Sequence, residues 1–257
     1  MRDAAPTFVF SETLSFPGLH GIDFNSNGLG GRYPSTSNAG FARQFLADSG
    51  IPRVETSIVL EGGALEIDGE GTLLATESSI INANRNPNVS RETTDQELYR
   101  LLGVSKIIWV PGLKGYEVTD AHIDIWARFV APGKVVLNNP GQHRPKLTAV
   151  HNEIKEILSQ ATDAKGRKFE VIDLPDAGID RPGPIDPDLC LNYVNYLLVN
   201  SAVIAPQFGD HQADAKARDI LQSLFPERKV IQVYLEEIAL NGGGVHCVTQ
   251  DIPRRWR

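Results

Sequence analysis

The chain has 257 residues, of which 41% are hydrophobic and 22% are charged, and its formal net charge is −7 at pH 7. This composition predicts a globular protein with a substantial core. The acidic charge argues against a nucleic-acid partner, because phosphate binding depends on clustered Lys and Arg. Two distant cysteines fit a reducing, cytoplasmic location. No signal peptide and no bilayer-spanning run is recognisable, so no membrane partner is expected.

A unit of two β-rich runs, a helical stretch and a final short strand recurs along the chain. In its first and least regular copy, a strand is expected in "PTFVF" and a loop-rich segment in "LHGIDFNSN". A helix is expected in "AGFARQFLADSG" and the last strand in "VETSIVL". The loop-rich segment makes this copy the hardest to match to the others.

The next three copies are more regular. In the second, "GGALEIDGEGTLLATE" predicts a hairpin with an Asp-Gly turn. The stretch "TTDQELYRLLG" predicts a helix with Thr93 or Thr94 as N-cap and Gly103 as C-cap, followed by a strand in "KIIWVP". The third copy is "HIDIWARFVAPGKVVLN", "KLTAVHNEIKEILSQAT" and "KFEVIDLP", and the fourth is "NYLLVNSAVIAPQF", "HQADAKARDILQSLF" and "KVIQVYL".

A fixed period of roughly 60 residues is typical of a repeat architecture, in which each unit shelters its neighbour's core. The residues at which one unit's final strand leads into the next hairpin are Asp3, Glu61, His122, Asp186 and Cys247. In a radial arrangement these junctions meet near one axis and can form a single site. Five junctions with four complete units predict one domain over residues 1–257 that lacks part of a unit at its N-terminus.

The junctions carry a thiol, an imidazole and carboxylates. Cys247 follows three glycines in "NGGGVHCVTQD", and glycines permit a sharp turn or a close approach to the backbone. A thiolate beside an imidazole can attack an electrophilic carbon. Carboxylates would disfavour that thiolate around a neutral substrate, but they suit a planar guanidinium cation. The sequence therefore indicates covalent chemistry on a guanidinium group.

His122 and Asp124 stand two residues apart, so in a strand both would face the same side. The functional interpretation is a general acid/base beside a cation-binding carboxylate. A metal pair is the alternative, but no third ligand has a recognisable zinc spacing, and we expect no metal. His246 and His211 receive no role, and Cys190 is expected in the core.

Four motifs in this order resemble those of the agmatine deiminases and the related bacterial-type peptidylarginine deiminases. They are "MRDAAPTF", "EGGALEIDGEGTLLATESSIINANRNP", "DAHIDIWARF" and "NGGGVHCVTQ". The resemblance implies an α/β fold, a five-fold pseudosymmetric propeller of the pentein type that here lacks part of one unit. The chain departs from the family pattern at Ala5, where a glycine is usual.

The resemblance also implies roles for the junction residues. Cys247 would be the nucleophile, and His122 would be first the acid that helps ammonia to leave and then the base that activates water. Asp3 and Asp124 would grip the guanidinium nitrogens, and Glu61 would support both the histidine and the substrate. Gly243 and Gly244 would bring the backbone close to the bound cation. No metal or organic cofactor is implied.

With agmatine as substrate, the expected products are N-carbamoylputrescine and ammonia. Two alternatives remain open from the sequence. One is deimination of arginine in a protein or peptide, which needs a more open mouth to the site. The other is an inactive, truncated scaffold, whose exposed strand edge would favour pairing with another chain, such as a homo-oligomer.

Overall fold

The computed structural model describes residues 1–12, 17–34, 39–142, 144–178, 191–240 and 242–253. Within them lie four three-stranded sheets, β1-β2-β3, β4-β5-β6, β7-β8-β9 and β10-β11-β12. In each sheet the first two strands pair antiparallel and the third pairs parallel to the second. A parallel pair needs a crossover connection, and a helix provides it in every unit. The predicted recurring unit is therefore confirmed four times.

The helices and strands follow one another in the expected order. The first unit consists of β1 (Thr7–Ser11), β2 (Gly18–Asp23), α2 (Phe41–Ser49) and β3 (Arg53–Glu55). The second consists of β4 (Glu66–Ile67), β5 (Thr72–Thr76), α4 (Arg91–Leu102) and β6 (Lys106–Val110). The third consists of β7 (Ala127–Ala131), β8 (Lys134–Asn139), α5 (Pro145–Gln160) and β9 (Glu170–Pro175). The fourth consists of β10 (Leu197–Val199), β11 (Ala202–Gln207), α6 (His211–Leu224) and β12 (Lys229–Tyr234).

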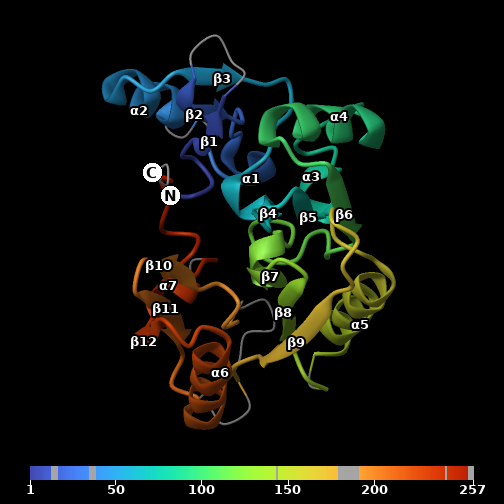
Figure 1. Cartoon of the computed structure of the whole chain (residues 1–257), viewed down its shortest axis with the longest axis vertical. Coiled ribbons are helices and arrows are strands. Elements are labelled where there is room, and N and C mark those ends of the chain that lie inside the picture. Colours follow the sequence, from blue (N-terminus) through green and yellow to red (C-terminus); the bar gives the residue numbers. More distant parts are fainter. Residues whose placement is uncertain (13–16, 35–38, 143, 179–190, 241, 254–257) are drawn as a thin grey trace.

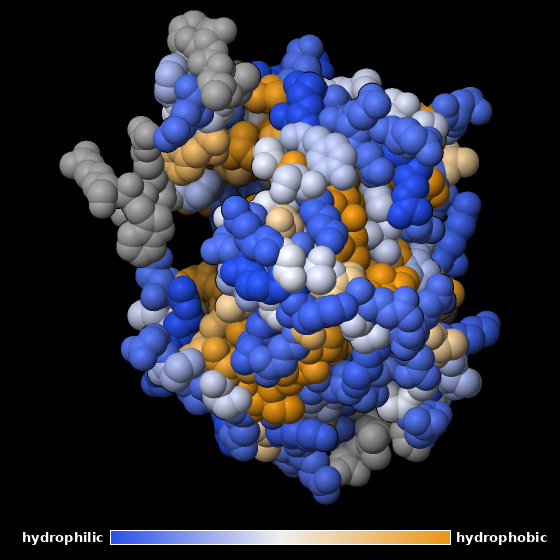
Figure 2. Space-filling model, turned by 45° about the vertical axis from the view of Figure 1, so that its right-hand side comes forward, coloured by the Kyte–Doolittle hydropathy of each residue, from blue (hydrophilic) through white to orange (hydrophobic). Residues whose placement is uncertain are grey.

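Short helices lie in the connections. Helices α1 (Gly28–Gly31) and α3 (Glu77–Ile80) follow the second strands of the first and second units, and α7 (Glu236–Ala239) follows β12. The 3₁₀ turns Gly62–Ala64 and Ile123–Ile125 join successive units. Figure 1 shows the four units following one another around a common centre, with both chain ends between the first and the fourth. Figure 2 shows a hollow on that side of the molecule, with apolar surface above and below it. Among the described residues, none of the helices has both the length and the apolar character that a bilayer crossing requires.

Several local predictions are corrected. Residues 18–23 form strand β2 rather than a loop, and the strand expected over 54–60 is reduced to β3. Helix α4 begins earlier than predicted because Ser90, which has extended backbone angles, accepts a hydrogen bond from the Thr93 backbone N–H. The C-cap prediction is confirmed, since Gly103 ends α4 in the left-handed conformation.

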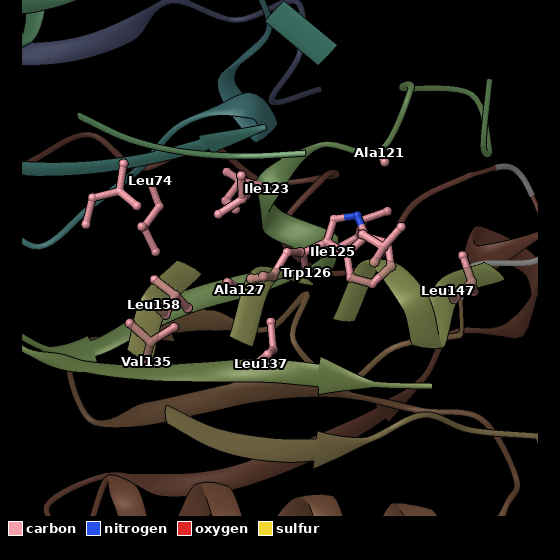
Figure 3. Close-up of a cluster of buried hydrophobic side chains, with 14 of the residues drawn as sticks. Leu74, Ala121, Ile123, Ile125, Trp126, Ala127, Val135, Leu137, Leu147 and Leu158 are labelled. Carbon is pink, nitrogen blue, oxygen red and sulfur yellow. The ribbon is translucent and has the colours of Figure 1, made fainter. Parts of the chain in front are cut away.

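The largest apolar cluster joins the second and third units. It includes Leu74 of β5, Val135 and Leu137 of β8, and Leu158 of α5, all fully buried. Figure 3 shows these side chains together with those of Ala121, Ile123 and Ile125. Every second residue from 121 to 125 therefore packs into the core, and His122 and Asp124 are left between them for another side.

Replacement of a core side chain on α5 tests this packing. Ile154 is fully buried in the cluster, so Ile154→Ala should lower the free energy of unfolding by about 2 to 5 kcal/mol. Glu153→Ala on the exposed face of the same helix should stay within about 0.5 kcal/mol of wild type. Urea unfolding measures both values, and equal losses would contradict the described packing.

Candidate active site

Cys247 is held by contacts that come mainly from the fourth unit. The Asn195 side-chain oxygen accepts hydrogen bonds from the backbone N–H groups of His246 (3.0 Å) and Cys247 (3.3 Å) and lies 3.5 Å from the Cys247 sulfur. Its amide nitrogen donates to the Asp124 carbonyl oxygen at 3.2 Å. Asn195 therefore ties the cysteine segment to the histidine segment. No sequence pattern marks it as a functional residue.

The glycines before Cys247 are needed for close packing. A methyl group at Gly244 would lie 2.4 Å from the Asn195 side-chain oxygen, and one at Gly243 would lie 3.2 Å from Cys247 Cβ. Gly242 has φ +82°, which a side chain rarely tolerates, and an added methyl would lie 2.5 Å from Val118. These glycines allow the backbone to fold tightly around Asn195 and Cys247.

His122 is fully buried, and a chain of ionic contacts holds it. Its Nε2 lies 3.1 Å from Glu61 Oε2. The same carboxylate accepts hydrogen bonds from Arg85 Nε at 2.7 and 3.0 Å, and Arg85 Nη1 donates to Asp120 at 2.7 Å. Glu61 is thus placed behind the imidazole, and its direct contact with a substrate stays a prediction. Arg85 belongs to the quoted "NANRNP" motif, but the sequence analysis assigned it no role.

A second buried glutamate near the site, Glu66, is also paired with an arginine. Glu66 accepts a hydrogen bond from Arg128 at 2.6 Å, and Arg128 stacks over the Tyr196 ring at 4.9 Å. Buried charges are expensive unless they are paired, so these arginines compensate for carboxylates placed around the site.

Asp3 completes the group from the start of the chain. Its Oδ1 accepts a hydrogen bond from the Gly63 backbone N–H at 3.0 Å and lies 3.7 Å from His122 Nδ1. A methyl group at Gly63 would lie 2.6 Å from His122 Nδ1, 3.0 Å from Asp124 Oδ2 and 3.1 Å from Asp3 Oδ1. The three side chains therefore converge on one point beside this glycine.

Asp124 lies next to the cysteine. Its Oδ2 is 3.7 Å from Cys247 Sγ and 2.8 Å from His246 Nδ1. Within the described part of the chain, Asp124 Oδ1 and His122 Nδ1 are buried and have no hydrogen-bond partner. A carboxylate oxygen that accepts and an imidazole nitrogen are thus available to a polar ligand.

One sequence prediction about this pair is wrong. His122 and Asp124 do not lie in a strand but flank and occupy the 3₁₀ turn Ile123–Ile125. The turn follows Asp120 and Ala121, whose φ values of +62° and +66° are unusual for residues other than glycine. Hydrogen bonds from Ala121 N to Glu117 and from His122 N to Thr119 stabilise this backbone. The His122 and Asp124 side chains still reach one site because Ala121, Ile123 and Ile125 pack into the core.

The charges of the site perturb its pKa values. Burial favours the neutral imidazole of His122, but Asp3 and Glu61 outweigh it and raise the pKa to about 9. Burial, with the nearby charge of Asp3, raises the pKa of Asp124 to about 6. Burial and the carboxylates of Asp124 and Asp3 raise the pKa of the Cys247 thiol well above its usual range. At neutral pH the unliganded site holds a thiol and a protonated imidazole.

A cavity of about 660 Å³ leads from the surface to this group. Asp3, Gly243 and Cys247 belong to its lining, together with apolar side chains that include Tyr33, Phe41 and Ile238. The cavity suits a ligand with a polar head and an apolar stem.

The structure brings together Asp3, Glu61, His122 and Cys247, which are four of the five junction residues, and it places Asp124 beside them. Asp186 and Cys190 lie outside the described residues. His211 begins α6, away from these contacts, whereas His246 belongs to the site. Among the described residues, no group of three or more His, Cys, Asp or Glu side chains is placed to hold a metal ion.

Comparison with known proteins decides the family. The family model of the Porphyromonas-type peptidyl-arginine deiminases matches residues 1–253. The chain belongs to this family. An agmatine deiminase of Medicago truncatula is 37% identical over 98% of this chain and 75% of its own length. One of Pseudomonas aeruginosa is also 37% identical, over 98% of this chain and 74% of its own.

A solved agmatine deiminase of Enterococcus faecalis has the same fold as this member of the family. The two superpose with a TM-score of 0.88 at 30% identity, over 99% of this chain and 74% of that one. This chain thus spans about three quarters of the length of these relatives. An amidinotransferase of Microseira wollei, only 13% identical, superposes with a TM-score of 0.57. The matches show an α/β fold of the pentein type.

The raised pKa of His122 makes the stability of this family member dependent on pH. Its pKa of about 9 exceeds the ordinary value of 6.5, so its contribution to stability is complete below pH 6.5 and lost as the pH rises through 9. NMR titration should find the His122 ring protonated at pH 7.5. Urea unfolding should show a larger loss of stability on alkalinisation for wild type than for His122→Gln, and equal losses would contradict this charge state.

The ion pair behind the histidine can be tested separately. Arg85→Met leaves the Glu61 carboxylate buried without its arginine, so the free energy of unfolding should fall by about 3 to 5 kcal/mol. Arg218, which pairs with Asp219 at the exposed surface of α6, is the matched control. Arg218→Met should change stability by less than about 1 kcal/mol. Similar urea midpoints for the two variants would show that the pair is not needed.

Proposed function

We propose that the protein is a cysteine-dependent hydrolase that deiminates agmatine to N-carbamoylputrescine and ammonia. The observation that carries the proposal is the convergence of a buried thiol, a charged imidazole and two carboxylates beside one cavity, which is lined by Cys247 and Asp3. The agmatine deiminases, 37% identical over nearly the whole chain, support this substrate.

The charge of the site favours a cationic substrate. Burial and the nearby charge of Asp3 raise the pKa of Asp124, so its ionisation is costly without a cation beside it. A guanidinium bound between Asp3 and Asp124 would offset the repulsion between the two carboxylates. It would also donate a hydrogen bond to Asp124 Oδ1, which has no partner among the described residues. Gly243 lines the cavity beside Cys247, whereas Gly244 packs against Asn195, and contact of either glycine with the substrate is part of the proposal.

Binding of the cation also prepares the nucleophile. The guanidinium neutralises the carboxylates that keep the Cys247 thiol protonated, so the pKa of the thiol falls when substrate is present and its proton passes to solvent. The thiolate then attacks the guanidinium carbon and forms a tetrahedral adduct. His122, protonated at neutral pH, gives its proton to the departing nitrogen. Ammonia leaves, and an S-alkylthiouronium remains on Cys247.

Hydrolysis reverses these roles. The neutral His122 takes a proton from a water molecule, whose oxygen attacks the thiouronium carbon. The C–S bond breaks, the ureido product leaves, and the sulfur departs as a thiolate. Glu61, held by Arg85, orients the imidazole through both steps and stabilises its charged form. The sequence supplies every group that these steps use, so no cofactor is part of the proposal.

The five-fold ring expected from the sequence belongs to the same proposal. The described residues supply four of its units, and the relatives are longer than this chain. Assembly into a homo-oligomer, and the absence of nucleic-acid and membrane partners, also remain predictions. None of them is required for the chemistry at Cys247.

Ammonia release tests the function directly. The purified chain should release ammonia from agmatine, and Cys247→Ala should lower the rate by more than about a thousandfold, because no other group can form the covalent bond. His211→Leu, at the exposed start of α6, is the control and should keep the wild-type rate.

A blocked peptidyl arginine, assayed in parallel, separates the two substrate classes. Faster turnover of the peptide than of agmatine would show that the substrate is arginine in a protein or peptide and not agmatine. No turnover of either substrate by folded protein would overturn the proposal and leave the inactive scaffold.

A further inference from the structure

His246 is a buried titratable group that the proposed mechanism does not use. The residue is 4% exposed, and its Nδ1 lies 2.8 Å from Asp124 Oδ2. Burial and the positive charges of Arg128 and Arg2 hold the pKa of His246 well below its usual range. A neutral imidazole carries one proton, and the adjacent carboxylate favours its position on Nδ1. The ring is therefore a fixed hydrogen-bond donor to Asp124.

This donor acts on one of the two carboxylate oxygens only. Oδ2 accepts a hydrogen bond from His246 Nδ1 and lies 3.7 Å from Cys247 Sγ, whereas Oδ1 has no hydrogen-bond partner among the described residues. Without His246, either oxygen could accept from the thiol, and the carboxylate could rotate. With His246 in place, Oδ2 already accepts one hydrogen bond, and Oδ1 stays without a protein partner among the described residues.

We propose that His246 is a positioning residue that fixes the orientation and the ionised state of Asp124 for the guanidinium. The inference rests on the proposed function, which gives Asp124 its ligand. A donor to a carboxylate favours the charged form, and two bonded positions on one oxygen leave the other for the substrate. His246 thus acts through Asp124 and does not itself contact the reacting atoms.

The surroundings of Asp124 explain why such a donor is useful. The titratable and charged groups that face it from the neighbouring segments are His122, Asp3, Arg2, Arg128, His246 and Cys247. Burial and Asp3 oppose its ionisation, while the cations favour it. A neutral donor favours the carboxylate without adding a positive charge that would repel a cationic substrate.

A purely structural role for the ring is the competing interpretation. The backbone N–H of His246 binds Asn195, and its carbonyl oxygen accepts from Arg2 Nε at 2.7 Å. These backbone contacts do not depend on the side chain. A set of variants can therefore separate filling of the space from donation to Asp124.

The experiment compares His246→Asn, His246→Gln and His246→Leu. The Asn amide nitrogen can occupy the place of Nδ1, whereas the Gln amide reaches the place of Nε2 and Leu donates nothing. His246→Leu and His246→Gln should lower kcat/KM for agmatine roughly tenfold. They should also move the acid limb of its pH profile upward by about one pH unit, because Asp124 loses its donor.

His246→Asn should recover most of the lost kcat/KM and bring the acid limb back toward wild type. Equal effects of Asn, Gln and Leu, or an unshifted acid limb in His246→Leu, would overturn the proposal in favour of simple packing. His211→Leu serves again as the control histidine substitution.

A measurement that needs no turnover keeps this test apart from the test of function. ¹³C NMR titration of the Asp124 carboxyl group, assigned with Asp124→Asn, should show a higher pKa in His246→Leu than in wild type or His246→Asn. If wild type releases no ammonia but this shift is seen, the proposed function fails and the positioning of Asp124 stands. If the three proteins titrate alike, the positioning is wrong even in an active enzyme.

Discussion

The ion pair between Arg85 and Glu61 is the interaction on which the rest of the site depends. Both side chains are fully buried, and Glu61 also contacts His122. A lone carboxylate at this depth would take up a proton or draw in water, and the imidazole would lose its charged partner. Arg85 is in turn held by Asp120, the first residue of the strained turn that leads to His122. One guanidinium thus fixes both the charge and the position of the histidine.

The repeated units provide the frame for this arrangement. Each unit ends on a strand parallel to its second strand, and the segment after that strand turns toward the centre of the molecule. Residues about 60 positions apart in the sequence therefore become neighbours in space. No single unit contains the site, so the chemistry depends on the packing between units, such as the cluster that joins β5 to α5.

Much of this was predictable from the sequence, and the failures have physical reasons. The recurring unit and the meeting of Asp3, Glu61, His122 and Cys247 follow from periodicity, because strand ends alone determine them. The turn around Asp124 did not follow, since the alternation of apolar and polar residues from 121 to 125 has the period of a strand although the backbone is not extended. Asn195, Arg85 and His246 were missed as functional groups because their importance lies in contacts between distant segments, which local patterns do not encode.

The carboxylates of Asp3 and Asp124 affect how the protein's stability can be measured. Under the proposed function these two carboxylates bind a guanidinium group. The cation of the common denaturant guanidinium chloride is then itself a ligand of the native state. A ligand that binds only the folded form stabilises it by mass action. At low concentration the salt would then protect the fold that it destroys at high concentration, and a linear extrapolation to water would fail. Urea, which carries no charge, avoids this ambiguity.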